Sequence, residues 1–124
     1  MTSGAFSAEV KASALMRAGY RCEACGTNPV TEFHHRLSRQ MGGSKEDFVA
    51  AVTNCLALCS TCHRYITENP RKAYEYGWMV RRGIERPAAV PVYVKDTWGR
   101  RRWVLLTWDG RYEEHRTDPL AVVR

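Results

Sequence analysis

The stretch that decides the fold runs from residue 22 to residue 63 and reads CEACGTNPVTEFHHRLSRQMGGSKEDFVAAVTNCLALCSTCH. It begins with one Cys-x-x-Cys pair, Cys22 and Cys25, and ends with a second, Cys59 and Cys62. Such a turn places two sulfurs on one side of a metal ion, and zinc prefers four ligands of this kind in a tetrahedron. The two pairs therefore predict a closed structural zinc site of four thiolates.

The spacing of the cysteines leaves two alternatives to zinc open. The pairs are separated by 33 residues, more than the roughly 15–20 of a compact zinc ribbon, so the spacer must hold a structure of its own. The cysteines could instead be buried and reduced, or form the reactive pair of a thiol redox protein; a second Cys-x-x-Cys pair favours zinc over both. Cys55 is left over, and we expect it to be a small buried hydrophobe.

Histidines gather in the same stretch. His34 and His35 lie between the cysteine pairs, Asn54 follows, and His63 comes directly after Cys62. A zinc ion on Cys59 and Cys62 would fix the start of the helix that carries His63 and would aim this side chain. Neighbouring residues of a strand point to opposite faces, so His34 and His35 can do different work, one binding an ion and the other activating water. This pattern favours metal-assisted hydrolysis at an open site.

Length and composition indicate what class of protein this is. The chain has 124 residues, 44% of them hydrophobic, which suits one small globular domain with a thin core. Its apolar runs are far shorter than the roughly 18 residues that span a bilayer. The N-terminus lacks the basic start and apolar middle of a secretory signal, so we expect a cytoplasmic protein without membrane contact.

Positive charge is concentrated after the histidines. Of the net +6, residues 71–102 supply nine basic and three acidic side chains, whereas residues 1–70 carry seven and six and residues 103–124 carry three and four. A basic block of this kind suits a polyanionic partner such as DNA. The alternative is an ordinary solvated basic face.

Periodicity and turn signals predict an α+β fold. The expected helices cover residues 7–18, a short segment from Ser44 to about Ala51, 60–68, and a helix opened by Asn69-Pro70 that ends at Gly77. The expected strands cover residues 31–35, 55–58, 90–95, 102–108 and 111–115, with a break near residues 86–91.

The motif residues resemble those of the HNH endonuclease family, especially the short zinc-containing HNH proteins of bacteriophages, including those of actinobacteria. The resemblance rests on the two cysteine pairs with His34-His35, Gly42-Gly43, Asn54, Leu58-Cys59, Cys62-His63 and the helix that follows. It covers about residues 20–77 of a single domain spanning 1–124 and leaves 78–124 as a basic segment with a small β extension. It implies a zinc-stapled ββα-metal (His-Me finger) core with flanking helices, and cleavage of DNA phosphodiester bonds.

The resemblance also implies a role for each motif residue. His35 matches the general base, His34 and His63 match the ligands of a catalytic divalent ion, and the side-chain carbonyl of Asn54 would orient the base. The four cysteines match the structural zinc ligands. A ligand set of two imidazoles could bind Mg²⁺, Mn²⁺, Ni²⁺ or Zn²⁺. Because it has no carboxylate, it argues against Mg²⁺ as the only ion that is used. A slip of one residue in strand register would exchange His34 and His35.

DNA contacts are expected around and after the motif. Arg36 would place its guanidinium beside the scissile phosphate, at a position where many relatives have an apolar residue. The other expected contacts are Arg39, Arg64, Arg71, Lys72, Arg81 and Arg82. Four tryptophans alternate with basic residues and could stack on bases, although we expect most of them to pack the core.

These observations together predict a metal-dependent HNH endonuclease that nicks or cleaves DNA, encoded by a phage and present in the host cytoplasm. In the phage proteins that it resembles, such enzymes work beside the terminase large subunit in genome packaging or as free-standing mobile endonucleases. The alternative of another class is a zinc-dependent nucleic-acid binding module without catalysis.

Overall fold

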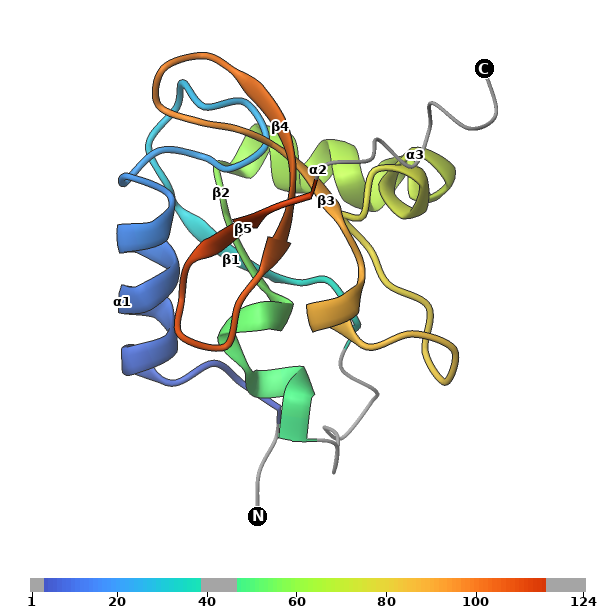
Figure 1. The fold of residues 1–124 in the computed structure, drawn as a ribbon. Helices are drawn as coiled ribbons and strands as arrows, with labels where there is room; N and C mark the ends of the chain where they lie inside the picture. The colour runs from blue at the N-terminus through green and yellow to red at the C-terminus, as the bar shows by residue number, and fades with distance from the viewer. Residues whose placement is uncertain (1–3, 39–46, 116–124) are drawn as a thin grey trace.

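Two small antiparallel sheets and three α-helices make up the part of the chain that the computed structural model describes, residues 4–38 and 47–115 (Figure 1). The first sheet pairs β1 with β2, and the second has the strand order β3-β4-β5. In chain order the α-helices and strands are α1 (Ala8–Arg17), β1 (Glu32–His35), β2 (Cys55–Leu58), α2 (Ser60–Glu68), α3 (Pro70–Glu75), β3 (Val92–Lys95), β4 (Arg101–Leu106) and β5 (Tyr112–Glu114). Short 3-10 helices cover Asp47–Ala50, Val52–Asn54 and Pro87–Ala89.

Strand β2 is buried on both faces and lies at the centre of the fold. Its side chains alternate, so that Leu56 and Leu58 enter the main hydrophobic cluster while Cys55 and Ala57 pack on the other face against α1. This explains why the CLAL run is apolar throughout rather than at every second position. Strand β1 pairs with it in the register His35 opposite Cys55.

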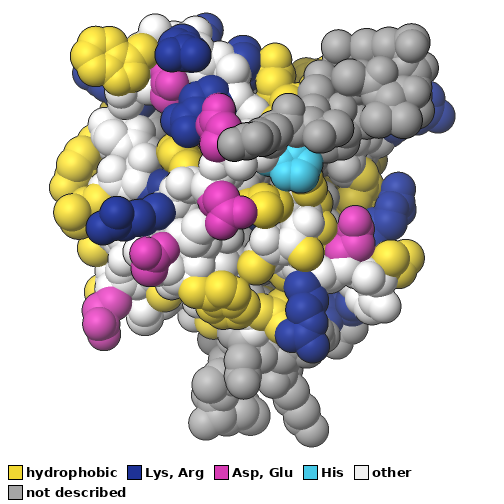
Figure 2. Space-filling model, viewed as in Figure 1, with side chains coloured by type: hydrophobic (Ala, Val, Ile, Leu, Met, Phe, Trp, Pro, Cys, Tyr) yellow, Lys and Arg dark blue, Asp and Glu magenta, His cyan; other side chains and the backbone are white. Residues whose placement is uncertain are grey.

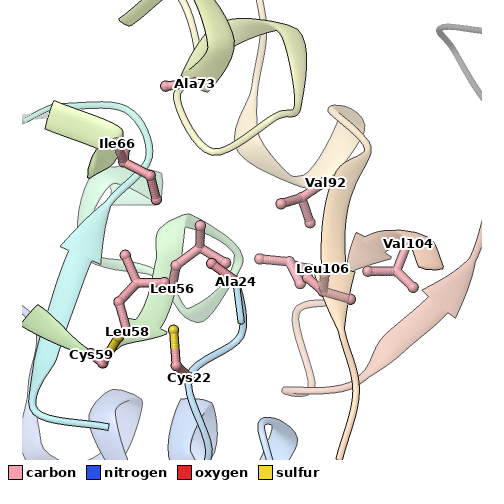
Figure 3. Close-up of a cluster of buried hydrophobic side chains, with 11 residues drawn as sticks. Cys22, Ala24, Leu56, Leu58, Cys59, Ile66, Ala73, Val92, Val104 and Leu106 are labelled. Atoms are coloured by element: carbon pink, nitrogen blue, oxygen red, sulfur yellow. The ribbon is translucent and has the colours of Figure 1, made fainter. Parts of the chain in front are cut away.

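The second sheet closes the main cluster from the other side. Val92, Val104 and Leu106 from this sheet pack with Leu56 of β2 and Ile66 of α2, and Cys22 and Cys59 belong to the same buried group (Figure 3). At about 25 cal/mol per Å² of apolar surface removed from water, this cluster is the main source of stability outside the cysteine site.

Each long helix has a local reason for its boundaries. The Ser7 hydroxyl accepts a hydrogen bond from the Val10 N–H and caps α1, which ends before Gly19 at a positive φ of 65°. Helix α2 has nine residues and is capped by Cys59, whose sulfur accepts from the Cys62 N–H. Pro70 supplies the first residue of α3.

A buried ion pair ties the N-terminal helix to both sheets. The Glu23 carboxylate accepts hydrogen bonds from the Arg17 guanidinium (Nε, 2.9 Å; Nη2, 2.8 Å), from the Ala57 N–H of β2 and from the Tyr112 hydroxyl of β5. Both charged side chains are 1% exposed. Because every oxygen of this carboxylate has partners, the burial of its charge is compensated.

The α+β class and most of the predicted boundaries are confirmed. The observed β2 and α2 coincide with the predicted ranges 55–58 and 60–68, and the other α-helices and strands begin and end within about two residues of theirs. The segment predicted as a helix from Ser44 to Ala51 is described only from residue 47, where it forms a 3-10 helix. Among the described residues there is no helix of the length and hydropathy needed to cross a membrane.

Gly77 closes the end of α3 against the second sheet and admits no side chain. Its φ is +75°, and a Cβ there would lie 1.9 Å from the Pro91 carbonyl oxygen. We expect Gly77→Ala to lower the free energy of unfolding by about 3 kcal/mol, since backbone must move and the residue is strained. Gly83→Ala is the control, because Gly83 has a similar φ of +79° and no atom within 4 Å. It should cost about 1 kcal/mol. Equal losses in urea denaturation would contradict this assignment.

Candidate metal centre and histidine site

The four cysteines of the two Cys-x-x-Cys pairs converge. The sulfur atoms of Cys22, Cys25, Cys59 and Cys62 all lie within 4.8 Å of one another, and this is the only group of three or more possible metal-ligating side chains in residues 4–38 and 47–115. Zn–S bonds of about 2.3 Å in a tetrahedron put sulfurs about 3.8 Å apart. The arrangement therefore fits a structural zinc ion, as the cysteine spacing predicts.

Local backbone geometry presents these sulfurs. In the first pair, the Gly26 N–H bonds to the Cys22 carbonyl at 2.7 Å, and Gly26 has a φ of +69°. In the second pair, the Cys59 sulfur accepts N–H bonds from Cys62 (3.4 Å) and from the Asn28 side chain (3.5 Å). N–H···S bonds of this kind favour the thiolate, which is the form that binds zinc.

The electrostatics of the four-cysteine cluster favour a bound cation. Burial raises the pKa of the Cys22 and Cys62 thiols. For Cys59, burial acts to raise the pKa of the thiol, but hydrogen bonds from Asn28 and Cys62 have the larger effect. The pKa of Cys59 is therefore lowered to about 7. Without a cation, neighbouring thiolates repel one another, so a divalent ion is what allows all four to be deprotonated.

Cys55 lies outside the cluster, as expected. It is fully buried against α1 with Phe6, Ala14 and Ala57, and burial raises the pKa of its thiol to about 12. It is therefore a neutral, small apolar side chain of the core.

His34 and His63 face each other across β1 and α2. Their ring centroids lie 5.0 Å apart, in an edge-to-face arrangement. The Nε2 of His34 lies 2.8 Å from the Trp78 carbonyl oxygen, an acceptor, so Nε2 carries the hydrogen and Nδ1 the lone pair. Burial lowers the pKa of His34 to about 4. At neutral pH it is an uncharged imidazole, the form that binds metal ions.

Glu32 orients His63 and was not among the residues predicted from the sequence. Its Oε1 lies 2.5 Å from Nδ1 of His63, which leaves Nε2 as the nitrogen that does not face Glu32. A surface cavity of about 260 Å³ opens here and is lined by Glu32, His63, Arg64, Thr67 and Glu68, with Ser60. The signal that could have identified Glu32 is its place two residues before His34, on the same face of the strand.

His35 lies on the opposite face of β1. Its ring stacks on Phe6 with centroids 3.8 Å apart and an interplanar angle of 11°, and its Nε2 lies 2.7 Å from the Gly4 carbonyl oxygen. A second cavity, of about 390 Å³, is lined by His35 and by Glu32, among others. Glu32 borders both this cavity and the one beside His63, so the two cavities adjoin at Glu32.

Asn54 supports the site through the backbone. Its buried side-chain carbonyl accepts from the Leu37 N–H at 2.7 Å, and its amide donates to the carbonyls of Leu37 (3.0 Å) and Val49 (2.9 Å). The expected hydrogen bond from this carbonyl to the His35 imidazole is not formed. Asn54 instead joins the chain just beyond β1 to the 3-10 helix Asp47–Ala50, since both N–H groups of its amide donate to backbone carbonyls and its side-chain carbonyl accepts from the Leu37 N–H.

The expected DNA contact at Arg36 is wrong. This side chain is 0% exposed and donates to four backbone carbonyls, those of Gly77, Thr53, Pro87 and Val90. Burial lowers the pKa of Arg36 to about 9, which still leaves a cation at pH 7. The carbonyl dipoles compensate its charge. Through these hydrogen bonds Arg36 joins the chain just after β1 to the segments before β2 and before β3.

The remaining expected DNA contacts differ in their surroundings. Arg64, Arg71, Lys72 and Arg81 are exposed, Arg82 donates to the Ser38 carbonyl, and Arg39 lies outside the described residues. Arg102 is engaged by Glu114 at 3.0 Å and by Asp96 at 3.9 Å. On the face shown in Figure 2, basic and acidic side chains are interspersed. Basic side chains thus do not form one continuous field on that face.

The structure therefore brings together the four cysteines, and separately His34, His63 and Glu32, while His35 lies on the other face of the same strand. Comparison with known proteins adds nothing to this geometry: no protein-family model, curated protein or solved structure matches the chain.

Proposed function

We propose that this protein is a metal-dependent endonuclease of the HNH type that hydrolyses phosphodiester bonds in DNA. The observation that carries the proposal is the pair His34 and His63, whose rings β1 and the helix α2 hold 5.0 Å apart in an edge-to-face arrangement. The four-cysteine cluster lies at the start of that same helix and fixes the position of His63.

Two nitrogen atoms would hold the catalytic divalent ion, Nδ1 of His34 and Nε2 of His63. In each ring the other nitrogen faces an oxygen of the protein: Nε2 of His34 faces the Trp78 carbonyl, and Nδ1 of His63 faces the Glu32 carboxylate. A divalent ion bound by them would supply Lewis-acid stabilisation of the charge that develops on the phosphate. Imidazole ligands suit Ni²⁺ or Zn²⁺ better than Mg²⁺.

Glu32 completes this arrangement as a positioning residue. A carboxylate that accepts from the second nitrogen of a ligating histidine fixes the tautomer and the ring orientation and makes the ligand more basic. The contact of 2.5 Å between Glu32 and His63 has this form. Glu32 therefore supports metal binding without being a ligand itself.

His35 is the proposed general base. Because its Nε2 faces the Gly4 carbonyl, the hydrogen lies on Nε2 and the lone pair on Nδ1. A histidine imidazole is the side chain that most often acts as general base near neutral pH. The stacked ring of Phe6 and the backbone bond hold the imidazole in one orientation.

One observation favours a second function, a zinc-dependent nucleic-acid binding module without catalysis. The ring of Phe6 lies flat against His35, so the N-terminal segment covers one face of the proposed base. A binding module requires the zinc cluster and exposed cations such as Arg64 and Arg71, but has no need of a reactive His35.

A plasmid nicking assay separates the two functions. With Mg²⁺, Mn²⁺, Ni²⁺ or Zn²⁺ added in turn, we expect the wild type to convert supercoiled DNA to the nicked form. His35→Ala should lower the rate by about 10²- to 10⁴-fold, the usual loss on removal of a general base. Zinc content and circular dichroism should be unchanged.

The matched control is His115→Ala, which removes a histidine that follows β5 and lies outside the site. It should nick like the wild type. A folded, zinc-loaded protein that nicks with none of these ions, or a His35→Ala variant as active as the wild type, would reject the nuclease and favour the binding module.

A further inference from the structure

The outer face of the β3–β4 hairpin is aromatic and basic. In the observed register Tyr93 pairs with Trp103 and Lys95 with Arg101, so these four side chains share one face. The opposite face carries Val92 and Val104, which are buried in the core. On the outer side Trp103 is buried, Tyr93 and Lys95 are half-buried, and Arg101 is exposed.

Aromatic rings extend this face toward α2. Tyr76 stacks on Trp78, with centroids 5.1 Å apart and an angle of 28°, and on Trp103, at 6.1 Å and 17°. Tyr65 of α2 meets Trp78 edge-on at 6.4 Å. The array thus runs from the buried Trp103 at one end to Tyr65 at the other, whose side chain is 47% exposed.

Cations lie over the same rings. The Arg101 guanidinium is 5.5 Å from the Tyr93 ring centroid, and the Lys72 ammonium is 5.9 Å from that of Tyr76. At the Tyr65 end there is a cavity of about 400 Å³, bordered by Tyr65, Ile66, Trp78, Arg101, Cys25 and Cys62. None of the described residues that line it carries a carboxylate.

We propose that this aromatic face binds unpaired nucleobases of single-stranded DNA. Every base presents a π-face that stacks on aromatic side chains, whereas in a duplex these faces are hidden by neighbouring base pairs. Lys72 and Arg101 would bind the phosphates on either side of the stacked base. A Zn²⁺ ion with four thiolates carries a net negative charge, so the cavity beside Cys25 and Cys62 suits an uncharged base rather than a phosphate.

Trp78 connects this face to the histidine site. Its ring belongs to the aromatic array, while its backbone carbonyl accepts from Nε2 of His34. A strand stacked on the aromatic face therefore brings a neighbouring phosphodiester toward His34 and His63. This inference rests on the proposed nuclease function for that placement, and it specifies the substrate as DNA with a single-stranded segment beside the bond that is cut.

The test is a binding measurement that does not depend on cleavage. Fluorescence anisotropy without added divalent ions compares a labelled single-stranded DNA oligonucleotide with the duplex of the same sequence. Tyr65→Ala should weaken single-strand affinity by about 10-fold or more, since one stacked base contributes about 1–3 kcal/mol. Duplex affinity should stay within about twofold. Tyr65→Phe keeps the ring and should bind like the wild type.

Trp108→Ala is the matched control, because Trp108 is 62% exposed and lies beyond β4, away from the array. It should change neither affinity. Unchanged single-strand binding by Tyr65→Ala, equal losses for single strand and duplex, or tighter binding of wild type to single-stranded RNA of the same sequence would each overturn the proposal.

The outcomes also separate this inference from the nuclease. A wild type that nicks plasmid while Tyr65→Ala binds single strands normally overturns the aromatic face and leaves the nuclease standing. A selective loss of single-strand affinity in a protein that nicks with none of the ions supports the aromatic face and rejects the nuclease.

Discussion

Cys59→Ser is expected to leave this protein unfolded and free of zinc at room temperature. Cys59 has three roles at once, since it is a ligand of the cysteine cluster, the cap of α2 and a member of the main core. Apparent binding free energies of structural zinc are about 10–16 kcal/mol, and a small domain is stable by only about 5–15 kcal/mol in total. Loss of the ion therefore removes more than the fold has in reserve.

Far-UV circular dichroism and metal analysis check this result, and chelation of the wild type should reproduce the unfolded spectrum. Cys55→Ala is the matched control, because Cys55 is as buried as Cys59 but lies on the other face of β2. It should keep its zinc and lose about 1 kcal/mol, the cost of a small cavity. A folded Cys59→Ser variant, or a Cys55→Ala variant without zinc, would contradict the assignment of the ligands.

Arg36→Met should lower the free energy of unfolding by about 4 kcal/mol or more. Methionine fills much of the same space but donates no hydrogen bond, so the carbonyls of Gly77, Thr53, Pro87 and Val90 lose the partner they share. An unsatisfied buried acceptor costs about 1–3 kcal/mol. Burial of a cation is itself unfavourable, so its removal alone could stabilise the protein. Here the carbonyl acceptors remain after the charge is removed, and we therefore expect the substitution to lower the free energy of unfolding.

Urea denaturation of zinc-loaded protein measures the effect, and Arg36→Lys is the informative comparison. Lysine restores the positive charge but not the planar fork that reaches four carbonyls, so it should recover only part of the loss. If Arg36→Met unfolds within about 1 kcal/mol of the wild type, the guanidinium does not hold these segments together.

The four-cysteine cluster and the separation of His34 from His35 could be predicted from the sequence because both follow from local geometry. The Cys-x-x-Cys spacing fixes how two sulfurs turn toward one ion, and strand alternation sends adjacent side chains to opposite faces. The predicted strands and helices matched for the same reason, since β2 has its continuous apolar run and α3 its proline start.

Arg36 and Asn54 could not be assigned from the sequence because their partners come from tertiary structure. A charged residue just after a short strand is usually solvated, and nothing local reveals that Gly77, Pro87 and Val90 direct their carbonyls at Arg36. The same holds for Glu23, whose partners Arg17 and Tyr112 come from α1 and β5. In each case the folded chain supplies the polar group with at least one partner that lies far away in sequence.

The cap that Cys59 provides for α2 has a consequence for the order in which the protein matures. With nine residues, α2 is shorter than the about 12–15 that an isolated helix needs to persist in water. The helix that carries His63 therefore forms only together with the cysteine cluster, and the first pair must already have been brought to it across the hairpin. On a nascent chain, we therefore expect His63 to reach its place beside His34 only after the two cysteine pairs have met.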